Sequence, residues 1–521
     1  MTDRRAGRAQ QVGGSLWIAR RTQEPREPLV GDLDVDVAVI GGGIVGVSAA
    51  MLLAAEGRTV ALLEARTIGG GNTGLSTAKA SLFHGMNFAK LIDDVGFDSA
   101  KHIVEGERAA LDVMRKWADE LGVPETAEPV WHWAYAATDD GFATLEKEKV
   151  AADALRVETR WAEPGEVPFG DRALGVPEQL NLDPVVLLDA FAERAAALGA
   201  HVHEGTRVVE VDLGDTNTLT TDTGAKVTAA HLVVATQLPI LDRSMVFAGS
   251  SYKRSHVVAL SHEDARGFAP DMYTGVDSGA LSVRPALDVD GSSVIIAAGN
   301  GHELTTDEDG THVEQLEQQA RALTGAGELR RAWLAHDVFP ADGHPFLGPI
   351  RGHDNVHVAT GFAGWGLAAG VSASLTISGL ILRGHARWHD AQRATRVGPY
   401  VKPSTLKEAV VTIKDFVGDR ISSDDASEVA TLEPGTGLVA RIDGRMVAIA
   451  RDGDGSLQAV DAACTHQGCI VRHEPEAACW QCPCHGSRFA IDGTVLQGPA
   501  IEALERIDVN ELDLPGAGQV E

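Results

Sequence analysis

The side chains with the clearest chemistry lie near the carboxyl end of the chain. Cys464 and His466 form the pattern C-x-H, and after fifteen further residues Cys482 and His485 form C-x-x-H. Two thiolates and two imidazoles can hold a [2Fe-2S] cluster, with the thiolates on one iron and the imidazoles on the other, and they also suit a tetrahedral zinc ion. All five cysteines fall between residues 464 and 484, so they indicate one local site, not a disulfide framework spread over a secreted fold.

A glycine pattern near the amino end is typical of dinucleotide binding. Gly41, Gly43 and Gly46 form G-x-G-x-x-G between an apolar strand and a helix of small residues. The first glycine permits a tight turn, the second lets the backbone approach a pyrophosphate, and the third brings helix and strand together. The helix N-terminus stabilises phosphate charge. Glu64 ends the next strand, where its carboxylate can accept hydrogen bonds from ribose hydroxyls.

The elements that must position these residues fall into three groups. Residues 35–64 read as strand, turn, helix and strand, and a helix at 183–200 and strands at 206–213 and 231–237 follow, which predicts an α/β core. Between about 250 and 335, strand-rich segments predict a mostly antiparallel second sheet inserted into the first domain. From about 428, short strands alternate with Gly/Asp turns, as in a small all-β domain.

Composition limits the possible partners. The net charge is -29, from 45 basic and 74 acidic residues, and it would repel phosphate backbones and anionic lipid, so nucleic-acid binding is not expected. The amino-terminal segment has a twin arginine without an apolar region behind it, so we do not interpret it as an export signal. The uncharged stretch 358–382 is rich in glycine, which favours a buried strand–turn–helix over an integral membrane segment. We therefore predict a cytoplasmic protein.

Two segments carry a family resemblance. They are IGGGIVGVSAAMLLAAEG…VALLEA followed by TIGGGNTGLSTAKASLFHG, and FPADGHPFLGPI…VHVATGFAGWG. Together they resemble the D-amino-acid-oxidase-like flavoproteins, including glycine oxidase, sarcosine oxidase and dimethylglycine dehydrogenase, over roughly residues 30–385. The resemblance implies FAD as the cofactor in preference to NAD, in an FAD-binding Rossmann-like domain with an inserted α+β substrate domain.

The same resemblance implies which residues contact FAD. The loop at 71–73 is expected to wrap the pyrophosphate and ribityl chain, the backbone of Val208 to touch the adenine, and the helix start near Gly366 to direct N–H groups at the flavin's pyrimidine edge. The full set of expected contacts is Gly41, Gly43, Gly46, Glu64, Gly71, Asn72, Thr73, Val208, Thr360, Gly361, Phe362 and Gly366.

The sequences CTHQGC and CPCHGSRF resemble the two cluster-binding loops of Rieske proteins, over about residues 428–512. The resemblance favours a [2Fe-2S] cluster over zinc, with Cys464, His466, Cys482 and His485 as ligands. The finer pattern resembles the Rieske proteins of respiratory and photosynthetic cytochrome complexes, which implies a disulfide between Cys469 and Cys484. Cys479 is then left over as a buried or strand residue.

These assignments divide the chain into three parts. Residues 30–385 are expected to form the FAD-dependent oxidoreductase, with FAD-binding segments at about 30–90, 180–245 and 336–385 and substrate-domain segments at about 91–180 and 245–335. Residues 386–427 form a connector with a short helix, TLKEAVVTIKDFVGD, and residues 428–521 form the Rieske domain.

The leading functional hypothesis is a dehydrogenase that oxidises a small amine or amino-acid-like substrate and passes electrons from flavin to the Rieske cluster. Sarcosine-oxidase-like members use a lysine near the flavin for oxygen activation, and the aligned segment 295–299 holds no lysine. Two alternatives stay open. The cluster feeds electrons into the flavin for oxygen-dependent oxidation, or the chain is an electron-transfer protein without its own organic substrate. The external electron partner is a protein or a quinone.

The sequence does not identify a catalytic base. His84, His302 and His344 lie in segments expected near the flavin, and Arg284 could pair with a substrate anion. Each of these side chains is more often structural or merely exposed than catalytic.

Overall fold

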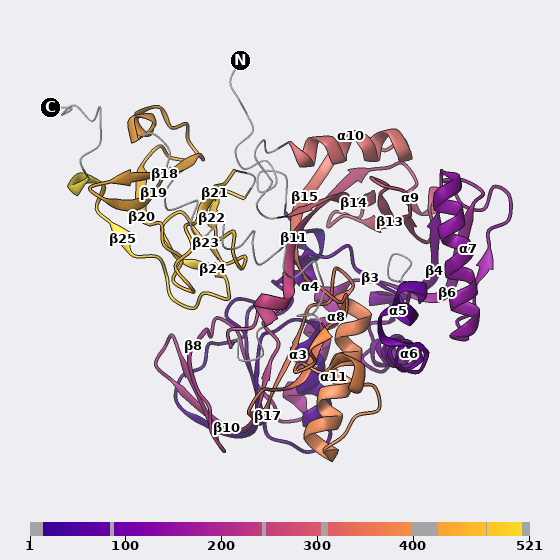
Figure 1. Cartoon of the computed structure of the whole chain (residues 1–521), viewed down its shortest axis with the longest axis horizontal. Coiled ribbons are helices and arrows are strands. Elements are labelled where there is room, and N and C mark those ends of the chain that lie inside the picture. Colours follow the sequence, from indigo (N-terminus) through magenta and orange to yellow (C-terminus); the bar gives the residue numbers. More distant parts are fainter. Residues whose placement is uncertain are drawn as a thin grey trace.

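The computed structural model describes residues 14–83, 88–241, 246–303, 311–398, 426–475 and 477–512. Over these residues the chain forms two large β-sheets with helices packed against them, and a small β-domain from its carboxyl-terminal part (Figure 1). The predicted connector helix lies outside the described residues.

The first sheet is built around the strand predicted from VDVAVI. Strand β1 (Leu33–Ile40) pairs in parallel with β2 (Val60–Leu63) on one side and with β10 (Lys226–Val234) on the other. Strands covered on both faces need continuous apolar runs, and β2 is buried along its whole length. The other strands of this eight-stranded sheet are β7 (His201–His203), β8 (Val208–Asp212), β9 (Asn217–Thr221), β16 (Phe346–Ile350) and β17 (His353–Thr360).

Three helices form the core against this sheet. Helix α3 (Ile44–Ala55) packs against α8 (Pro184–Ala197) and α11 (Gly366–Arg383). Helix α11 is long and apolar enough to cross a membrane by length and composition, and 67% of its apolar window is buried inside the structure. Its small residues allow the close contact with α3, where Ser374 donates to the carbonyl of Val45 at 2.9 Å.

The second sheet has nine strands, and all of its pairings except β12 (Met272–Gly275) with β4 (Ala127–Tyr135) are antiparallel. This confirms the predicted mostly antiparallel inserted sheet. Helix α10 (His312–Thr324) packs on β11 (Ser250–Ser261) and β14 (Ser293–Glu303). The remaining strands are β3 (Lys79–Ala80), β5 (Arg160–Trp161), β6 (Ala173–Leu182), β13 (Ser282–Leu287) and β15 (Leu329–Pro340), and the larger flanking helices are α5 (Phe88–Val95), α6 (Phe97–Glu120) and α7 (Asp139–Ala154).

The small domain is all-β, as predicted. It consists of two four-stranded antiparallel sheets, which lie beside β11 and β8 in Figure 1. One sheet contains β18 (Gly437–Ile442), β19 (Arg445–Arg451), β20 (Leu457–Asp461) and β25 (Arg506–Ile507), and the other contains β21 (Arg472–Glu474), β22 (Cys479–Gln481), β23 (Arg488–Phe489) and β24 (Val495–Gln497).

The folded unit begins before residue 30. The short helix α2 (Leu16–Ala19) buries Trp17, whose Nε1 donates to the carbonyl of Ser76 at 2.9 Å. Arg21 binds both oxygens of Asp189 at 3.0 Å and also reaches Glu204. These contacts fix the loop that follows the predicted FAD-binding glycines.

Candidate functional site

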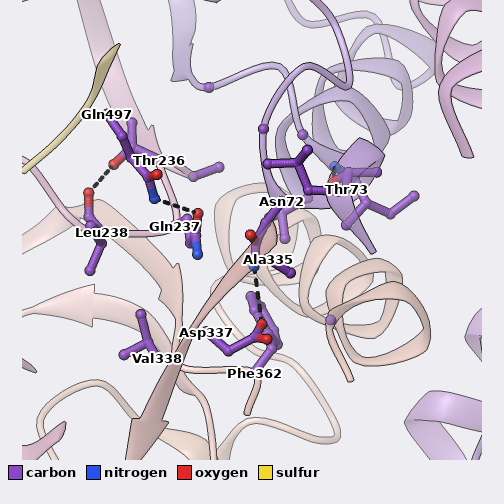
Figure 2. Close-up of a pocket in the computed structure, with 18 of the residues that line it drawn as sticks. Asn72, Thr73, Thr236, Gln237, Leu238, Ala335, Asp337, Val338, Phe362 and Gln497 are labelled. Atoms are coloured by element: carbon purple, nitrogen blue, oxygen red, sulfur yellow. Dashed lines mark hydrogen bonds between the residues drawn. The ribbon is translucent and has the colours of Figure 1, made fainter. Parts of the chain in front are cut away.

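A cavity of about 520 Å³ lies between the two large sheets, and the small domain contributes to its lining. Its walls come from the β1–α3 turn, the loop at 71–77, strands β11, β13 and β15, the loop at 359–367, and residues 488 and 496–501 of the small domain. Figure 2 shows Gln497 of the small domain beside Gln237, with 3.3 Å between its Nε2 and the Oε1 of Gln237. Volumes of this size are typical of cofactor and substrate sites.

The glycine turn has the geometry that a dinucleotide site requires. Gly41 adopts a φ of +108°, and a Cβ there would lie 2.5 Å from the carbonyl oxygen of Ala235. A Cβ on Gly46 would lie 1.9 Å from the carbonyl oxygen of Gly41, so helix and strand approach closely only because Gly46 has no side chain. The Glu64 carboxylate accepts from the N–H of Gly42 at 2.6 Å and of Arg66 at 2.7 Å.

Three guanidinium groups line the cavity near this turn. Arg66 follows β2, Arg207 precedes β8, and Arg488 comes from the small domain. Burial lowers the pKa of Arg66, and the charges of Arg207 and Arg488 lower it further, while Glu64 opposes them. None of the three forms an ion pair within 4 Å among the described residues, so this end of the cavity is suited to an anion such as a pyrophosphate.

The loop that contains the short helix α4 (Asn72–Leu75) joins the glycine turn to β15. The Thr73 hydroxyl accepts from the N–H of Ile44 at 3.0 Å, and the Asn72 amide donates to the Asp337 carboxylate at 3.0 Å (Figure 2). Burial raises the pKa of Asp337 to about 6.

Most of the predicted FAD contacts line this cavity. Gly46 and Thr360 do not: Gly46 sets the helix approach, and the Thr360 hydroxyl donates to the carbonyl of Gln237. The predicted residues that do line it are Gly41, Gly43, Glu64, Gly71, Asn72, Thr73, Val208, Gly361, Phe362 and Gly366.

None of the described catalytic candidates lines the cavity. The Arg284 guanidinium donates to the carbonyls of Ala78 at 2.6 Å and Leu182 at 3.1 Å, which is a structural role. His344 is buried 3.8 Å from Asp94, and His302 stacks on His312 with ring centroids 4.1 Å apart. The fourth candidate, His84, lies outside the described residues.

Sequence reasoning missed a lysine. Residues 295–299 in β14 carry none, as expected, but Lys79 of β3 lines the cavity. The only signal was its place six residues after Thr73, directly beyond the loop expected to wrap the cofactor. Arg488 was also missed as a lining residue, although it belongs to the CPCHGSRF segment.

The four predicted metal ligands lie close together in the small domain. The Cys464 thiol interacts with the Cys482 thiol, and the rings of His466 and His485 lie 5.0 Å apart between centroids. Burial lowers the pKa of His466, and it lowers the pKa of His485 to about 4. Burial therefore favours the neutral form of both imidazoles, which is the form that binds metal. The Ser487 hydroxyl contacts Cys464.

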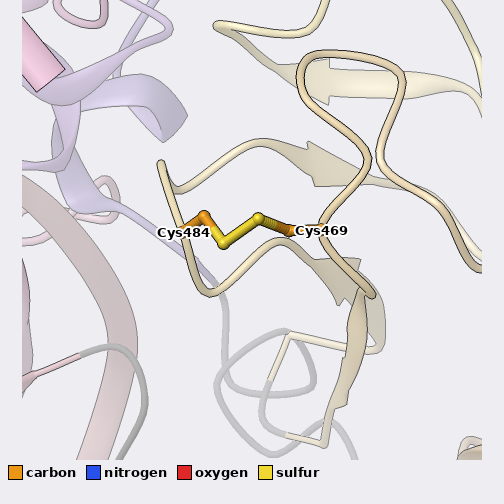
Figure 3. The surroundings of a disulfide bond; sticks show 2 residues. All are labelled: Cys469 and Cys484. Carbon is orange, nitrogen blue, oxygen red and sulfur yellow. A yellow bond between two sulfur atoms is a disulfide. The ribbon is translucent and has the colours of Figure 1, made fainter. Parts of the chain in front are cut away.

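The two ligand-bearing loops are joined by a disulfide between Cys469 and Cys484, with Cα atoms 6.4 Å apart (Figure 3). This is the bond that the Rieske resemblance implied. Cys479 is buried in β22 and packs with the apolar residues of the second large sheet. The fifth cysteine therefore belongs to the contact between the domains.

Strand β11 presents one face to the cavity and the other to the small domain. Ser255 and Val257 line the cavity, and because side chains alternate along a strand, Arg254 points to the other face. There Arg254, which is fully buried, forms an ion pair with Glu474 and donates to the side chain of Gln481, both in the small domain.

Strand β15 repeats this arrangement. Ala335 and Asp337 line the cavity, whereas the buried His336 lies 3.4 Å from the Nε of Arg254 and bonds to Gln481. The backbone of His336 in turn accepts from the Asn72 amide and donates to the Asn72 oxygen at 3.1 Å. One strand residue thus connects the cofactor loop to the small domain.

A ring contact joins the two sites more directly. The ring of Tyr252 on β11 meets the ring of His485 edge-on, with centroids 6.4 Å apart. Tyr252 also packs against Leu238 and Val338, which line the cavity.

Comparisons with known proteins match this division. The family model described as FAD dependent oxidoreductase matches residues 36–378, and the model of the Rieske [2Fe-2S] domain matches residues 424–508. The protein YhfW of Bacillus subtilis (strain 168), whose name describes it as a Rieske 2Fe-2S iron-sulfur protein, is 28% identical over 96% of this chain and 99% of its own. The cytochrome b6-f complex iron-sulfur subunit of Chlorobaculum tepidum is 36% identical over 20% of this chain and 58% of its own.

Solved structures resemble the larger part of the chain. L-proline dehydrogenase from P. horikoshii has a TM-score of 0.57 at 20% identity and covers 68% of this chain and 95% of its own. Glycine oxidase from Geobacillus kaustophilus has a TM-score of 0.57 at 17% identity and covers 67% of this chain and 95% of its own. At these identities the likeness establishes the fold alone.

Proposed function

Because the chain belongs to the FAD dependent oxidoreductase family and also carries a Rieske [2Fe-2S] domain, we propose that it dehydrogenates a small amine or amino-acid-like substrate and passes the electrons from FAD to the cluster. FAD supplies an acceptor for a hydride from substrate and a donor of single electrons to iron. The protein's own residues bind the two cofactors, orient the substrate and exclude water.

We assign FAD to the cavity between the sheets. The turn at 41–43 and the loop at 71–73 would hold the pyrophosphate, Glu64 the ribose, and Val208 the adenine. The guanidinium groups of Arg66, Arg207 and Arg488 form no ion pair among the described residues, so their N–H donors are suited to a dianionic pyrophosphate. We assign the cluster to Cys464, Cys482, His466 and His485, whose neutral imidazoles suit the second iron.

The observation that carries the proposal is that the small domain contributes residues to the lining of the proposed flavin cavity. Residues 488 and 496–501 line the cavity itself, and the ligand His485 reaches its wall through Tyr252. Tyr252 is thus the one side chain between the cavity-lining residues Leu238 and Val338 and the proposed cluster ligand His485, along which an electron would pass between the two cofactors. This supports direct exchange between the two centres within one chain.

The substrate end of the cavity favours a compact and mostly apolar molecule. Val257, Ala298, Leu75 and Trp365 line it, and among the described residues its only cation is Lys79. The arginines that line the cavity all lie at the nucleotide end. A small amine fits this lining better than a dicarboxylic or phosphorylated substrate.

Lys79 also favours a second candidate function. In its protonated form, Lys79 would stabilise negative charge that develops on oxygen beside the flavin. Electrons would then pass in the opposite direction, from an external donor through the cluster to the flavin and on to oxygen. In that case air would reoxidise the flavin rapidly and amines would not reduce it. The external partner, a protein or a quinone, is common to both directions.

An anaerobic titration separates these functions. The full chain with both cofactors is titrated with secondary amines and amino acids while flavin absorbance and the cluster's electron paramagnetic resonance signal are recorded. Bleaching of the flavin followed by appearance of the reduced-cluster signal is the expected result. If no amine bleaches the flavin while a one-electron donor reduces the cluster first, the dehydrogenase proposal is wrong.

A further inference from the structure

Six titratable side chains line the cavity among the described residues, and none of them is a histidine. Glu64 is held by backbone N–H groups of the glycine turn, and Asp337 by the Asn72 amide. Three others are the arginines at the nucleotide end. The sixth, Lys79, lies on β3 of the second sheet and is the only basic side chain that the described part of this sheet contributes to the cavity, because Asp337 on β15 is acidic.

Lys79 is fixed in one position. It lies on the two-residue strand β3, its side chain is 5% exposed, and its Nζ donates to the carbonyl of Tyr273 at 3.3 Å and to the hydroxyl of Ser282. Ser282 lines the cavity beside it. A neutral amine has two N–H donors and one lone pair, so these two acceptors satisfy its donors and leave the lone pair for a proton from a ligand.

The surroundings of Lys79 disfavour its charged form. Burial lowers the pKa of Lys79 to about 7, and the positive charge of Arg284 on β13 contributes in the same direction. The facing residue on β6, Asn181, is uncharged, and burial raises the pKa of Tyr273 on β12 above its usual range, so its hydroxyl stays neutral. On α11, the remaining element packed against β3, the one charge is Arg383 at its far end. No carboxylate faces Lys79 from these elements.

The geometry points to Lys79 as the catalytic base of the amine oxidation, an inference that rests on the proposed function. The Nζ of Lys79 accepts the proton that a substrate ammonium must lose before its α-carbon can give up hydride. The α C–H bond then breaks, its hydrogen and both electrons go to oxidised FAD, and a C=N bond forms from the nitrogen lone pair. Ser282 positions the amine of Lys79.

Stopped-flow reduction of the flavin under anaerobic conditions tests this role. In the unaltered chain, the limiting rate at saturating amine should rise with pH and level off above about 7. For Lys79→Met, we expect a loss of about 100-fold or more, because general-base catalysis contributes about 10²–10⁴-fold. In this variant, the inflection in the dependence of the limiting rate on pH should also move towards the pKa of the substrate's ammonium group, about 10. Added methylamine should restore part of the rate.

The controls separate the possible failures. Lys116→Met, on an exposed part of α6, should reduce its flavin at the unaltered rate. If the unaltered chain itself is not reduced by any amine, the proposed function fails, whereas an unchanged rate and pH profile in Lys79→Met refutes only the role of Lys79. A different result would contradict the role of Lys79 as a base: a raised KM for amino acids in Lys79→Met with an unchanged limiting rate, and a normal KM in Lys79→Arg. That result would mean that Lys79 binds a substrate carboxylate.

A stability measurement tests the protonation state without activity. The pKa of Lys79 is lower in the folded chain than in the unfolded chain, so the unfolded chain binds more protons between about pH 7 and 10.5. The cost of burying the charge is fully present below pH 7 and is relieved as the pH rises. Lys79→Met should therefore melt at a higher temperature than the unaltered chain at pH 6, and the gap should shrink by pH 9.5. A gap that does not change with pH contradicts the assignment.

Discussion

Arg488 of the small domain lines the proposed flavin cavity and forms no ion pair with the carboxylates of the described residues. Its Nη2 donates to the sulfur of Cys479 at 3.4 Å, and its buried Nε has no hydrogen-bond partner among the described residues. Its charge lowers the pKa of both Arg66 and His336. Like charges placed this close are destabilising unless an anion lies between them, and the pyrophosphate of FAD is that anion in our assignment.

We expect Arg488→Gln to weaken FAD binding while the cluster remains in place. The loss of one hydrogen bond to a charged group costs about 1.5–3 kcal/mol, which corresponds to an increase in Kd of about 10- to 100-fold. Quenching of FAD fluorescence by the flavin-free chain measures this Kd. Arg506→Gln is the matched control, because Arg506 is exposed and pairs with Asp492 in the same domain. An unchanged Kd for Arg488→Gln would show that Arg488 does not contact the phosphates.

The elements around the glycine turn could be predicted from the sequence because their signals are local. An apolar strand, a glycine turn and a helix of small residues follow one another between Val35 and Ala55, and the cysteine–histidine segments are equally compact. Lys79 was missed because a strand of two residues has no periodicity, and its neighbour Ser282 comes some 200 residues later. The same limit applies to Arg254. The alternation of side chains in YKRSHVVAL predicts a strand, but it does not reveal that Gln481, 227 residues away, contacts the face of the strand that carries Arg254.

The contact between β11 and β21 provides a test at the level of elements. Arg254→Met would leave Glu474 buried without its ion pair, and breaking a buried pair in this way costs about 3–5 kcal/mol. We expect a lower midpoint of urea unfolding, partly restored in Arg254→Met with Glu474→Gln. Arg266→Met, which removes an exposed pair with Glu128, should cost less than about 1 kcal/mol. Equal effects of the two single changes would mean that the Arg254 pair does not hold the domains together.

On the scale of the whole molecule, the small domain packs on one face of the second large sheet at its outermost strands. Strand β15 is the last strand of that sheet, and β11 lies next to it. His336 on β15 contacts the small domain through Gln481, and Cys479 packs into the core of the same sheet. These contacts support a fixed relation between the proposed flavin cavity and the proposed cluster ligands.

This fixed relation predicts that electrons cross between the centres within a single chain. After rapid anaerobic reduction of the flavin, the reduced cluster should appear with a first-order rate that does not change over a tenfold range of protein concentration. High salt should leave this rate unchanged, because screening slows the diffusional encounter of charged partners and acts far less on groups already buried in contact. Flavin and cluster absorbance followed at two wavelengths give both rates. A rate that rises in proportion to concentration, or falls steeply with salt, would place the transfer between separate chains, and the contact of Tyr252 with His485 would then have no role in it.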